Sequence, residues 1–190
     1  MAPFAPEWVQ NIMRIGIDIS QIVYEGTGVA TYVRELVSRL IAEDKNNSYV
    51  LFGASLRRQN EFRAYFNTLP HDRVSLVTSR IPPTILSLLW NVLHIVPIEK
   101  FTGPLDIFWS SDWTQPPLTR ARGVTTIHDL STMLFPKEMD AGIVATHARR
   151  LKRVKKECTV IFCDSESTKR DVMKYLKIPE NQLHVVYPGL

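Results

Sequence analysis

The chain has 190 residues, of which 45% are hydrophobic and 22% are charged, a composition typical of a globular domain with a sizeable core. Its formal net charge of +4 is too small to indicate a nucleic-acid-binding protein. The two cysteines, Cys158 and Cys163, lie on one predicted strand and face opposite sides of it, which excludes a disulfide framework. We therefore expect a cytoplasmic protein in a reducing compartment.

The first twelve residues, MAPFAPEWVQNI, differ from the sequence that follows. They contain two prolines and lack the apolar and basic regions of a secretory signal. We expect residues 1–12 to be an extension and residues 13–190 to form one domain. No repeat, low-complexity segment or linker divides residues 13–190.

Strand-like and helix-like segments alternate along the rest of the chain. The strand-like runs are mostly apolar on both faces, as expected when helices cover both sides of a parallel sheet. The alternation predicts an α/β fold with a mainly parallel sheet, in which ligands bind beyond the carboxyl ends of the strands. The predicted strands are 13–19, 48–52, 73–77, 105–110, 123–129, 158–163 and 183–187, and the predicted helices are 28–44, 55–69, 84–96, 139–157 and 166–176.

A short glycine-containing turn, Gly26-Thr27-Gly28, follows the first strand and precedes the first helix. Glycines allow a ligand to approach the backbone closely, and the helix N-terminus offers free N–H groups to a phosphate. The dinucleotide-binding fingerprint is incomplete, because Ala30 and Thr31 occupy the next positions. The turn is either a phosphate-binding loop or a plain flexible connection.

His128 and Asp129 stand together at the end of the predicted strand 123–129. They either face a cleft that binds polar hydroxyl groups, or serve the local structure. In the second case Asp129 caps the following turn and His128 donates to a carbonyl. The other histidines show no ligand spacing with His128, so we expect no metal site.

Ser165 opens the predicted helix 166–176 and has the side chain of an N-cap. A ligand contact is the alternative, since helix capping and ligand binding share this end of the sheet. The basic run ARRLKRVKK, residues 148–156, indicates a solvated helix face or attraction to anionic lipid headgroups. The apolar segment 85–98 is too short to span a membrane, which takes about 20 residues, and is either a buried helix or a monotopic membrane patch.

Four segments in order, RIGIDIS, EGTGVATYVREL, VTTIHDLSTMLFP and VIFCDSESTKRDVMKYLKIPENQLHVVYPG, resemble the N-terminal, acceptor-side domain of a family 4 (group 1) retaining glycosyltransferase of the GT-B fold. The resemblance covers residues 13–190 and is loose over 54–104. It implies a Rossmann-like domain with helices on both faces. It also implies transfer of a sugar from a nucleotide sugar to a glycan or lipid-linked acceptor, without a metal or other cofactor. The segment IHDLSTMLFP most resembles mannosyltransferases that use GDP-mannose.

The resemblance also implies roles for single residues along the expected cleft. His128 would contact the donor sugar near the reacting centre, with Asp129 beside it. The other positions border the cleft: Gly26, Thr27 and Gly28 near the donor phosphates, Ser165 at the edge, and Pro188 with Gly189 at the start of the hinge.

In such enzymes a second domain holds the nucleotide sugar, and we expect it to be missing after Leu190. We therefore expect this chain to be inactive alone. We also expect the protein to work at the cytoplasmic side of a membrane, with peripheral membrane contact and no nucleic-acid partner. A nucleotide-sugar epimerase of the same fold and a non-catalytic ligand-binding α/β domain are the alternatives.

Overall fold

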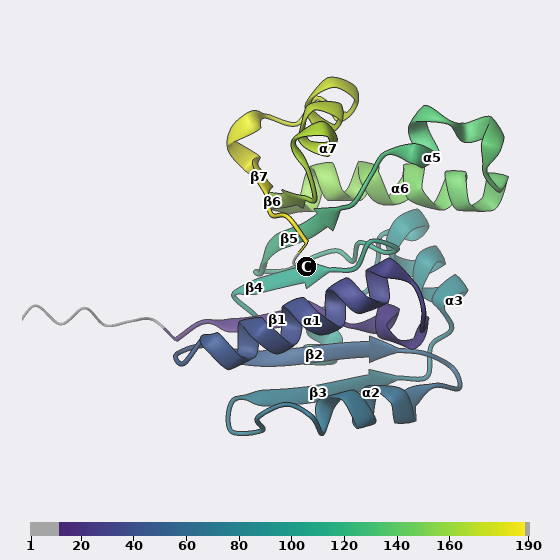
Figure 1. Ribbon diagram of the computed structural model, residues 1–190. Coiled ribbons are helices and arrows are strands. Elements are labelled where there is room, and N and C mark those ends of the chain that lie inside the picture. The colour runs from purple at the N-terminus through teal and green to yellow at the C-terminus, as the bar shows by residue number, and fades with distance from the viewer. Residues whose placement is uncertain (1–11, 189–190) are drawn as a thin grey trace, which may run out of the picture.

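The computed structural model describes residues 12–188, and its centre is one sheet of seven parallel strands in the order β3-β2-β1-β4-β5-β6-β7 (Figure 1). The chain builds outward from β1 to β3 and then returns to the other side of β1. In such sheets the point of reversal, here between β1 and β4, is where ligands bind. The strands are β1 (Arg14–Asp18), β2 (Ser48–Ala54), β3 (Val74–Ser79), β4 (Ile107–Ser110), β5 (Arg122–Ile127), β6 (Cys158–Cys163) and β7 (Leu183–Val185).

Helices cover both faces of the sheet, as the alternation of segments predicted. Two of them continue into π-helical segments, Leu88–Leu93 after α3 and Val172–Leu176 after α7, and short 3-10 turns form at Ser20–Val23, Pro136–Glu138 and Glu180–Gln182. The α-helices are α1 (Gly28–Glu43), α2 (Gln59–Phe66), α3 (Pro83–Ser87), α4 (Glu99–Thr102), α5 (Ser131–Leu134), α6 (Ala141–Glu157) and α7 (Glu166–Asp171).

The pleat of β2 shows how the two faces are filled. Tyr49 and Leu51 pack with α1 and α2 on one face, whereas Val50 and Phe52 pack on the other with Trp90 of the π-helical segment. Successive side chains of a strand point to opposite faces, so a strand buried on both sides is apolar at every position. The structure confirms the predicted α/β fold and makes the described sheet fully parallel.

Several predicted boundaries were wrong. The predicted strand 123–129 ends at Ile127, so His128 and Asp129 lie in the connection that follows it. The predicted helix 84–96 changes to π-helical geometry at Leu88 and ends in left-handed backbone at His94, with φ 55°. A helix rarely continues into the residue before a proline, and Pro97 follows closely.

Both cysteines are free and buried, and burial raises the pKa of the Cys158 thiol to about 12 and that of Cys163 to about 11. Because the thiolate is the reactive form, neither should react with Ellman's reagent in the folded protein at pH 8. Both should react fully in guanidinium chloride, which absorbance at 412 nm would measure (~2 thiols per chain). Rapid reaction of the native protein would contradict this burial.

Candidate functional site

Polar side chains gather at the shared carboxyl edge of the central strands. Because parallel strands all end at one edge, residues far apart in sequence are brought together there. Three carboxylates at this edge each have one buried oxygen without a hydrogen-bond partner in the described part of the chain. Most buried polar atoms are paired, so unpaired oxygens at three strand ends of one edge mark a place where a ligand or water completes the structure. These carboxylates are Asp18 at the end of β1, Asp112 after β4 and Asp164 after β6.

The His128 side chain is held by a hydrogen-bond partner that the sequence reasoning missed. Its Nδ1 lies 2.6 Å from Asp164 Oδ2, and its ring meets the Tyr32 ring edge-on at 5.0 Å. The Thr168 hydroxyl donates to the His128 carbonyl at 3.1 Å. A carboxylate accepts hydrogen bonds, so Nδ1 carries a proton and Nε2 is left for other partners. Asp164 could have been noticed as the first polar residue after the strand 158–163.

Asp129 is exposed, and its Oδ1 accepts from the backbone N–H of Ser131 at 2.7 Å. This hydrogen bond is the one expected if Asp129 caps the turn that follows it. Ser165 caps α7 as predicted, since its hydroxyl oxygen accepts from the N–H of Thr168 at 3.1 Å. The structure therefore gives both residues a local role, and their contact with a ligand stays a prediction.

The loop at residues 26–28 has geometry that requires glycine at its first position. Gly26 has φ 80°, and a Cβ on Gly26 or Gly28 would meet no atom within 4 Å, so the space above them is open. Thr27 caps α1, because its hydroxyl oxygen accepts from the N–H of Ala30 at 3.2 Å and donates to the Tyr24 carbonyl at 2.8 Å. The open space suits a ligand, and phosphate binding at this loop stays a prediction.

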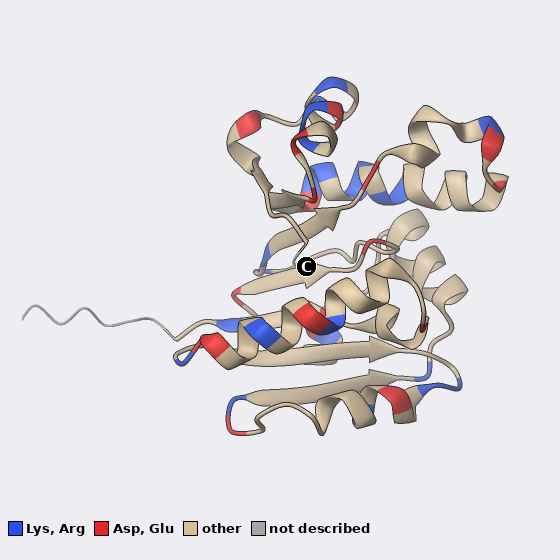
Figure 2. Ribbon diagram, viewed as in Figure 1, with Lys and Arg blue, Asp and Glu red and all other residues tan. Residues whose placement is uncertain are grey.

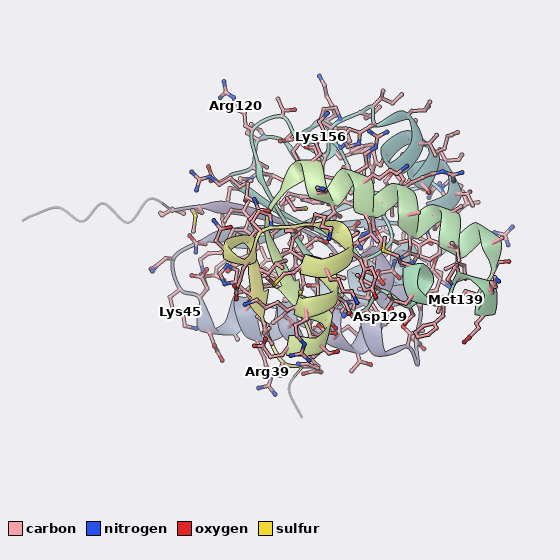
Figure 3. The ribbon with its side chains drawn as sticks, turned by 90° about the horizontal axis from the view of Figure 1, so that it is seen from above. Arg39, Lys45, Arg120, Asp129, Met139 and Lys156 are labelled. Atoms are coloured by element: carbon pink, nitrogen blue, oxygen red, sulfur yellow. The ribbon has the colours of Figure 1, made fainter. Side chains whose placement is uncertain are left out.

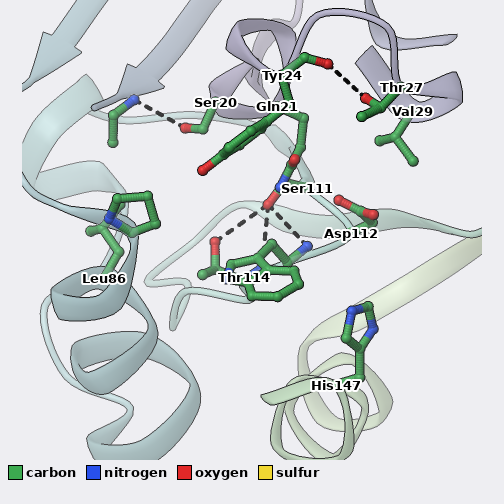
Figure 4. Close-up of a pocket in the computed structure, with 13 residues that line it drawn as sticks. Ser20, Gln21, Tyr24, Thr27, Val29, Leu86, Ser111, Asp112, Thr114 and His147 are labelled. Atoms are coloured by element: carbon green, nitrogen blue, oxygen red, sulfur yellow. Dashed lines mark hydrogen bonds between the residues drawn. The ribbon is translucent and has the colours of Figure 1, made fainter. Parts of the chain in front are cut away.

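Two hollows lie on either side of Thr27. The first, which we name the β1–β4 pocket, has a volume of about 440 Å³ (Figure 4). The second, which we name the α1 groove, has about 660 Å³ and lies between α1 and the segment Val186–Pro188. It includes Pro188 of the predicted hinge, whereas Gly189 and Leu190 lie outside the described residues. The β1–β4 pocket is lined by Ser20, Gln21, Tyr24, Thr27, Val29, Ala54, Pro83, Leu86, Ser111, Asp112, Trp113, Thr114 and His147.

Apart from Thr27, sequence reasoning did not identify the polar residues of the β1–β4 pocket. Asp112 follows β4 just as His128 follows β5, and this shared position after a strand was a usable signal. His147 lies inside α6, where nothing in the sequence separates it from an ordinary helix residue. Burial, together with the positive charge of Arg150, holds the His147 pKa below its ordinary value, while the carboxylates Asp112 and Asp129 act in the opposite direction.

Arg150 corrects the interpretation of residues 148–156 as a solvated basic face. It is 2% exposed, and its guanidinium donates to the Ser111 carbonyl at 3.1 Å, to the Thr125 hydroxyl at 2.6 Å and to the Thr126 carbonyl at 3.2 Å. These bonds tie the segment after β4 to the end of β5. The guanidinium therefore holds together the two connections that carry Asp112 and His128.

The family model described as Glycosyltransferase Family 4 matches residues 26–190. The chain belongs to glycosyltransferase family 4. The match covers most of the chain and confirms the family proposed from the sequence. The fully parallel sheet with helices on both faces confirms the Rossmann-like half of a GT-B enzyme. Comparison with curated proteins gave no match.

Within residues 12–188, no group of three or more His, Cys, Asp or Glu side chains is arranged to hold a metal ion. The absence of a metal from the reaction stays a prediction. Over the same residues, no helix is both long enough and apolar enough to cross a membrane.

Replacing Arg150 with methionine should destabilise the domain. The change leaves two buried carbonyls without their donor and removes the positive charge near Asp112, for an expected loss of about 3 kcal/mol. Arg149→Met is the matched control, because Arg149 is exposed one position away on the same helix. Urea unfolding would measure both variants, and equal stabilities would show that the buried guanidinium contributes nothing.

Proposed function

We propose that this domain is the acceptor-side half of a retaining glycosyltransferase that moves a sugar from a nucleotide sugar to a glycan or lipid-linked acceptor. The observation that supports it best is the set of unpaired carboxylate oxygens at the carboxyl ends of β1, β4 and β6, beside the open loop at residues 26–28. Sugars carry many hydroxyl donors, and carboxylate oxygens are strong acceptors for them. Family membership supports glycosyl transfer as the reaction that we assign to this edge.

We further propose mannose carried by GDP as the donor, on the resemblance of residues 127–136. His128 would contact the donor sugar as charge develops at its reacting carbon. Asp164 would hold the imidazole in place and fix its tautomer. Donor phosphates would lie near residues 26–28, where the α1 N-terminus favours an anion. The reaction would need neither a metal nor another cofactor.

A second domain would complete the cleft, and residues 1–190 alone would then transfer no sugar. Electrostatic stabilisation of a departing nucleotide diphosphate requires preorganised groups, and in this proposal the second domain supplies part of them. The products formed by the full-length protein distinguish the transferase from its two alternatives. A transferase would move the sugar to an acceptor, and an epimerase would change the donor sugar without an acceptor. A binding module would leave the donor intact.

His128→Ala in the full-length enzyme should lower kcat about 100- to 1000-fold, because a preorganised partner of the transition state is lost. KM should change much less, since the contact acts mainly as charge develops. Initial rates with radiolabelled nucleotide sugars would give both constants. The melting temperature would show whether the variant is folded.

His184→Ala is the control, because His184 is an exposed residue of β7. A folded His128→Ala enzyme with the wild-type kcat would remove His128 from the reacting centre and leave it as a structural residue beside Asp164. Chromatography of the products would distinguish glycosyl transfer from epimerisation.

We also propose that the surface around residues 85–95 contacts an anionic membrane at the cytoplasmic side. Arg153 of α6 donates to the Asn91 and Val92 carbonyls, so this apolar surface adjoins the helix that carries the basic run. Lys and Arg colour the C-terminal half of α6 in Figure 2, and Lys156 lies at the far end of that helix from Met139 in Figure 3. The exposed aliphatic side chains are Ile85, Leu88, Val92, Leu93 and Ile95.

Leu93→Glu should weaken binding to vesicles of phosphatidylglycerol and phosphatidylcholine, since the change removes an exposed apolar contact and adds a repelled charge. Leu56→Glu is a matched control, because Leu56 is 52% exposed and Leu93 is 53% exposed, and Leu56 follows β2, outside the segment 85–95. Co-sedimentation at low and high salt would measure both. Binding that is equal for anionic and neutral vesicles, or equally weakened by the two changes, would contradict the proposal.

A further inference from the structure

We infer that the β1–β4 pocket binds an uncharged, hydroxyl-bearing sugar of the acceptor, and that Asp112 selects against anionic acceptors. The inference rests on the proposed function, because it assigns the acceptor of that reaction to particular residues. The pocket is separate from the predicted donor contacts, because neither His128 nor Gly26 or Gly28 lines it. Thr27 is the one predicted donor contact that it shares.

The wall of the pocket suits the C–H face of a sugar ring. Apolar side chains come from three separate elements, with Val29 from α1, Leu86 from α3 and Trp113 from the segment after β4. The Trp113 ring is held edge-on against His147, with ring centroids 5.3 Å apart. Ligand pockets typically combine such a wall with a few polar groups that orient the ligand.

The polar side chains that line the pocket include Gln21, Asp112 and His147 (Figure 4). The partly exposed Asp112 carboxylate lines the pocket, and its Oδ1, although buried below the surface, has no hydrogen-bond partner among the described residues. The carboxylate is therefore free to accept from a ligand hydroxyl. The pKa of His147 is lowered by burial, so its imidazole is neutral near pH 7 and offers one donor and one acceptor. Hydroxyl groups both donate and accept, and they match this set of partners.

By contrast, the polar residues of the pocket do not suit an anion. Among the described residues that line it, none is a lysine or arginine, and Asp112 contributes a carboxylate. Arg150 acts on Asp112 electrostatically, but its guanidinium is buried and bound to Ser111, Thr125 and Thr126. A phosphate or a uronic-acid carboxylate would therefore meet a like charge without a free cation.

The position of the pocket also fits an acceptor. Thr27 lines it and stands between the two glycines of the open loop, while Asp129, next to His128, lies within electrostatic range of His147. A sugar bound here would lie beside the predicted donor contacts. Its hydroxyls could then reach the reacting carbon once the donor is bound.

Saturation-transfer difference NMR on the 190-residue chain would test the subsite without requiring catalysis. The probes are methyl α-mannopyranoside, methyl α-glucopyranoside and methyl β-galactopyranoside, with methyl glucuronide as the anionic probe. We expect at least one neutral glycoside to bind about 10-fold more tightly than the glucuronide, the size of one hydrogen bond to a charged group. Binding of none of the neutral glycosides, or equal binding of the glucuronide, would overturn the inference.

Asp112→Asn keeps the size of the side chain and removes its charge. It should weaken neutral-glycoside binding about 10-fold and abolish the preference over the glucuronide, because the anion no longer meets a like charge. Asp72→Asn is the control, because the Asp72 side chain is 68% exposed and lies just before β3. Unchanged binding and preference in Asp112→Asn would overturn the role of Asp112.

The full-length enzyme distinguishes failure of the subsite from failure of the proposed function. With an active enzyme, Asp112→Asn should raise KM for the acceptor about 10-fold and leave KM for the nucleotide sugar unchanged. Transfer with unchanged acceptor KM would overturn the subsite and leave the transferase standing. Glycoside binding at Asp112 in a full-length protein without transfer would do the reverse.

Discussion

A buried guanidinium determines how the carboxyl edge of the sheet is arranged. Arg150 is fixed by three acceptors on the connections after β4 and within β5, so it cannot leave without breaking all of them. Burial lowers its pKa, yet the negative charge of Asp112 acts in the opposite direction. The cation therefore stabilises a carboxylate that would otherwise be costly in this setting. The β1–β4 pocket depends on this arrangement, because Arg150 donates to the carbonyl of Ser111, the first residue of the Ser111–Thr114 wall.

The carboxylates of this edge divide into two kinds. Asp164 is engaged by His128 and orients it, so that carboxylate acts through another side chain. Asp18 is 3% exposed, and burial raises its pKa above the ordinary value, although the N–H of Ser20 donates to it at 2.9 Å. Asp112 borders the pocket with one oxygen unpaired among the described residues. All three carboxylates keep one oxygen unpaired among the described residues, so Asp112 is distinguished by its place in the wall of the β1–β4 pocket.

The sequence was sufficient for the fold and for part of the edge. Alternating apolar segments predicted the parallel sheet, because strands buried on both faces need apolar residues at every position. The position of His128 after a strand predicted that it lies at the carboxyl edge. Asp112 also follows a predicted strand closely, but it was not predicted as a site residue. His147 and Arg150 could not be found this way, because only the packing of α6 against β4 and β5 turns two of its many polar residues inward.

The same packing explains why the basic run has more than one role. An α-helix presents successive residues 100° apart, so a run of basic side chains on α6 cannot all face solvent. Arg150 turns to the sheet, Arg153 reaches the carbonyls at the end of the π-helical segment, and Arg149 remains exposed. Near the end of that segment, His94 joins Glu157 of α6 at 2.8 Å, so the apolar surface at 85–95 is fixed to the helix at two points. Since Asn91 also donates to the Trp113 carbonyl at 3.0 Å and accepts from the Gln115 N–H at 3.0 Å, this surface is connected to the wall of the β1–β4 pocket. A partner that contacts residues 85–95 therefore acts on a segment bonded directly to the proposed acceptor subsite.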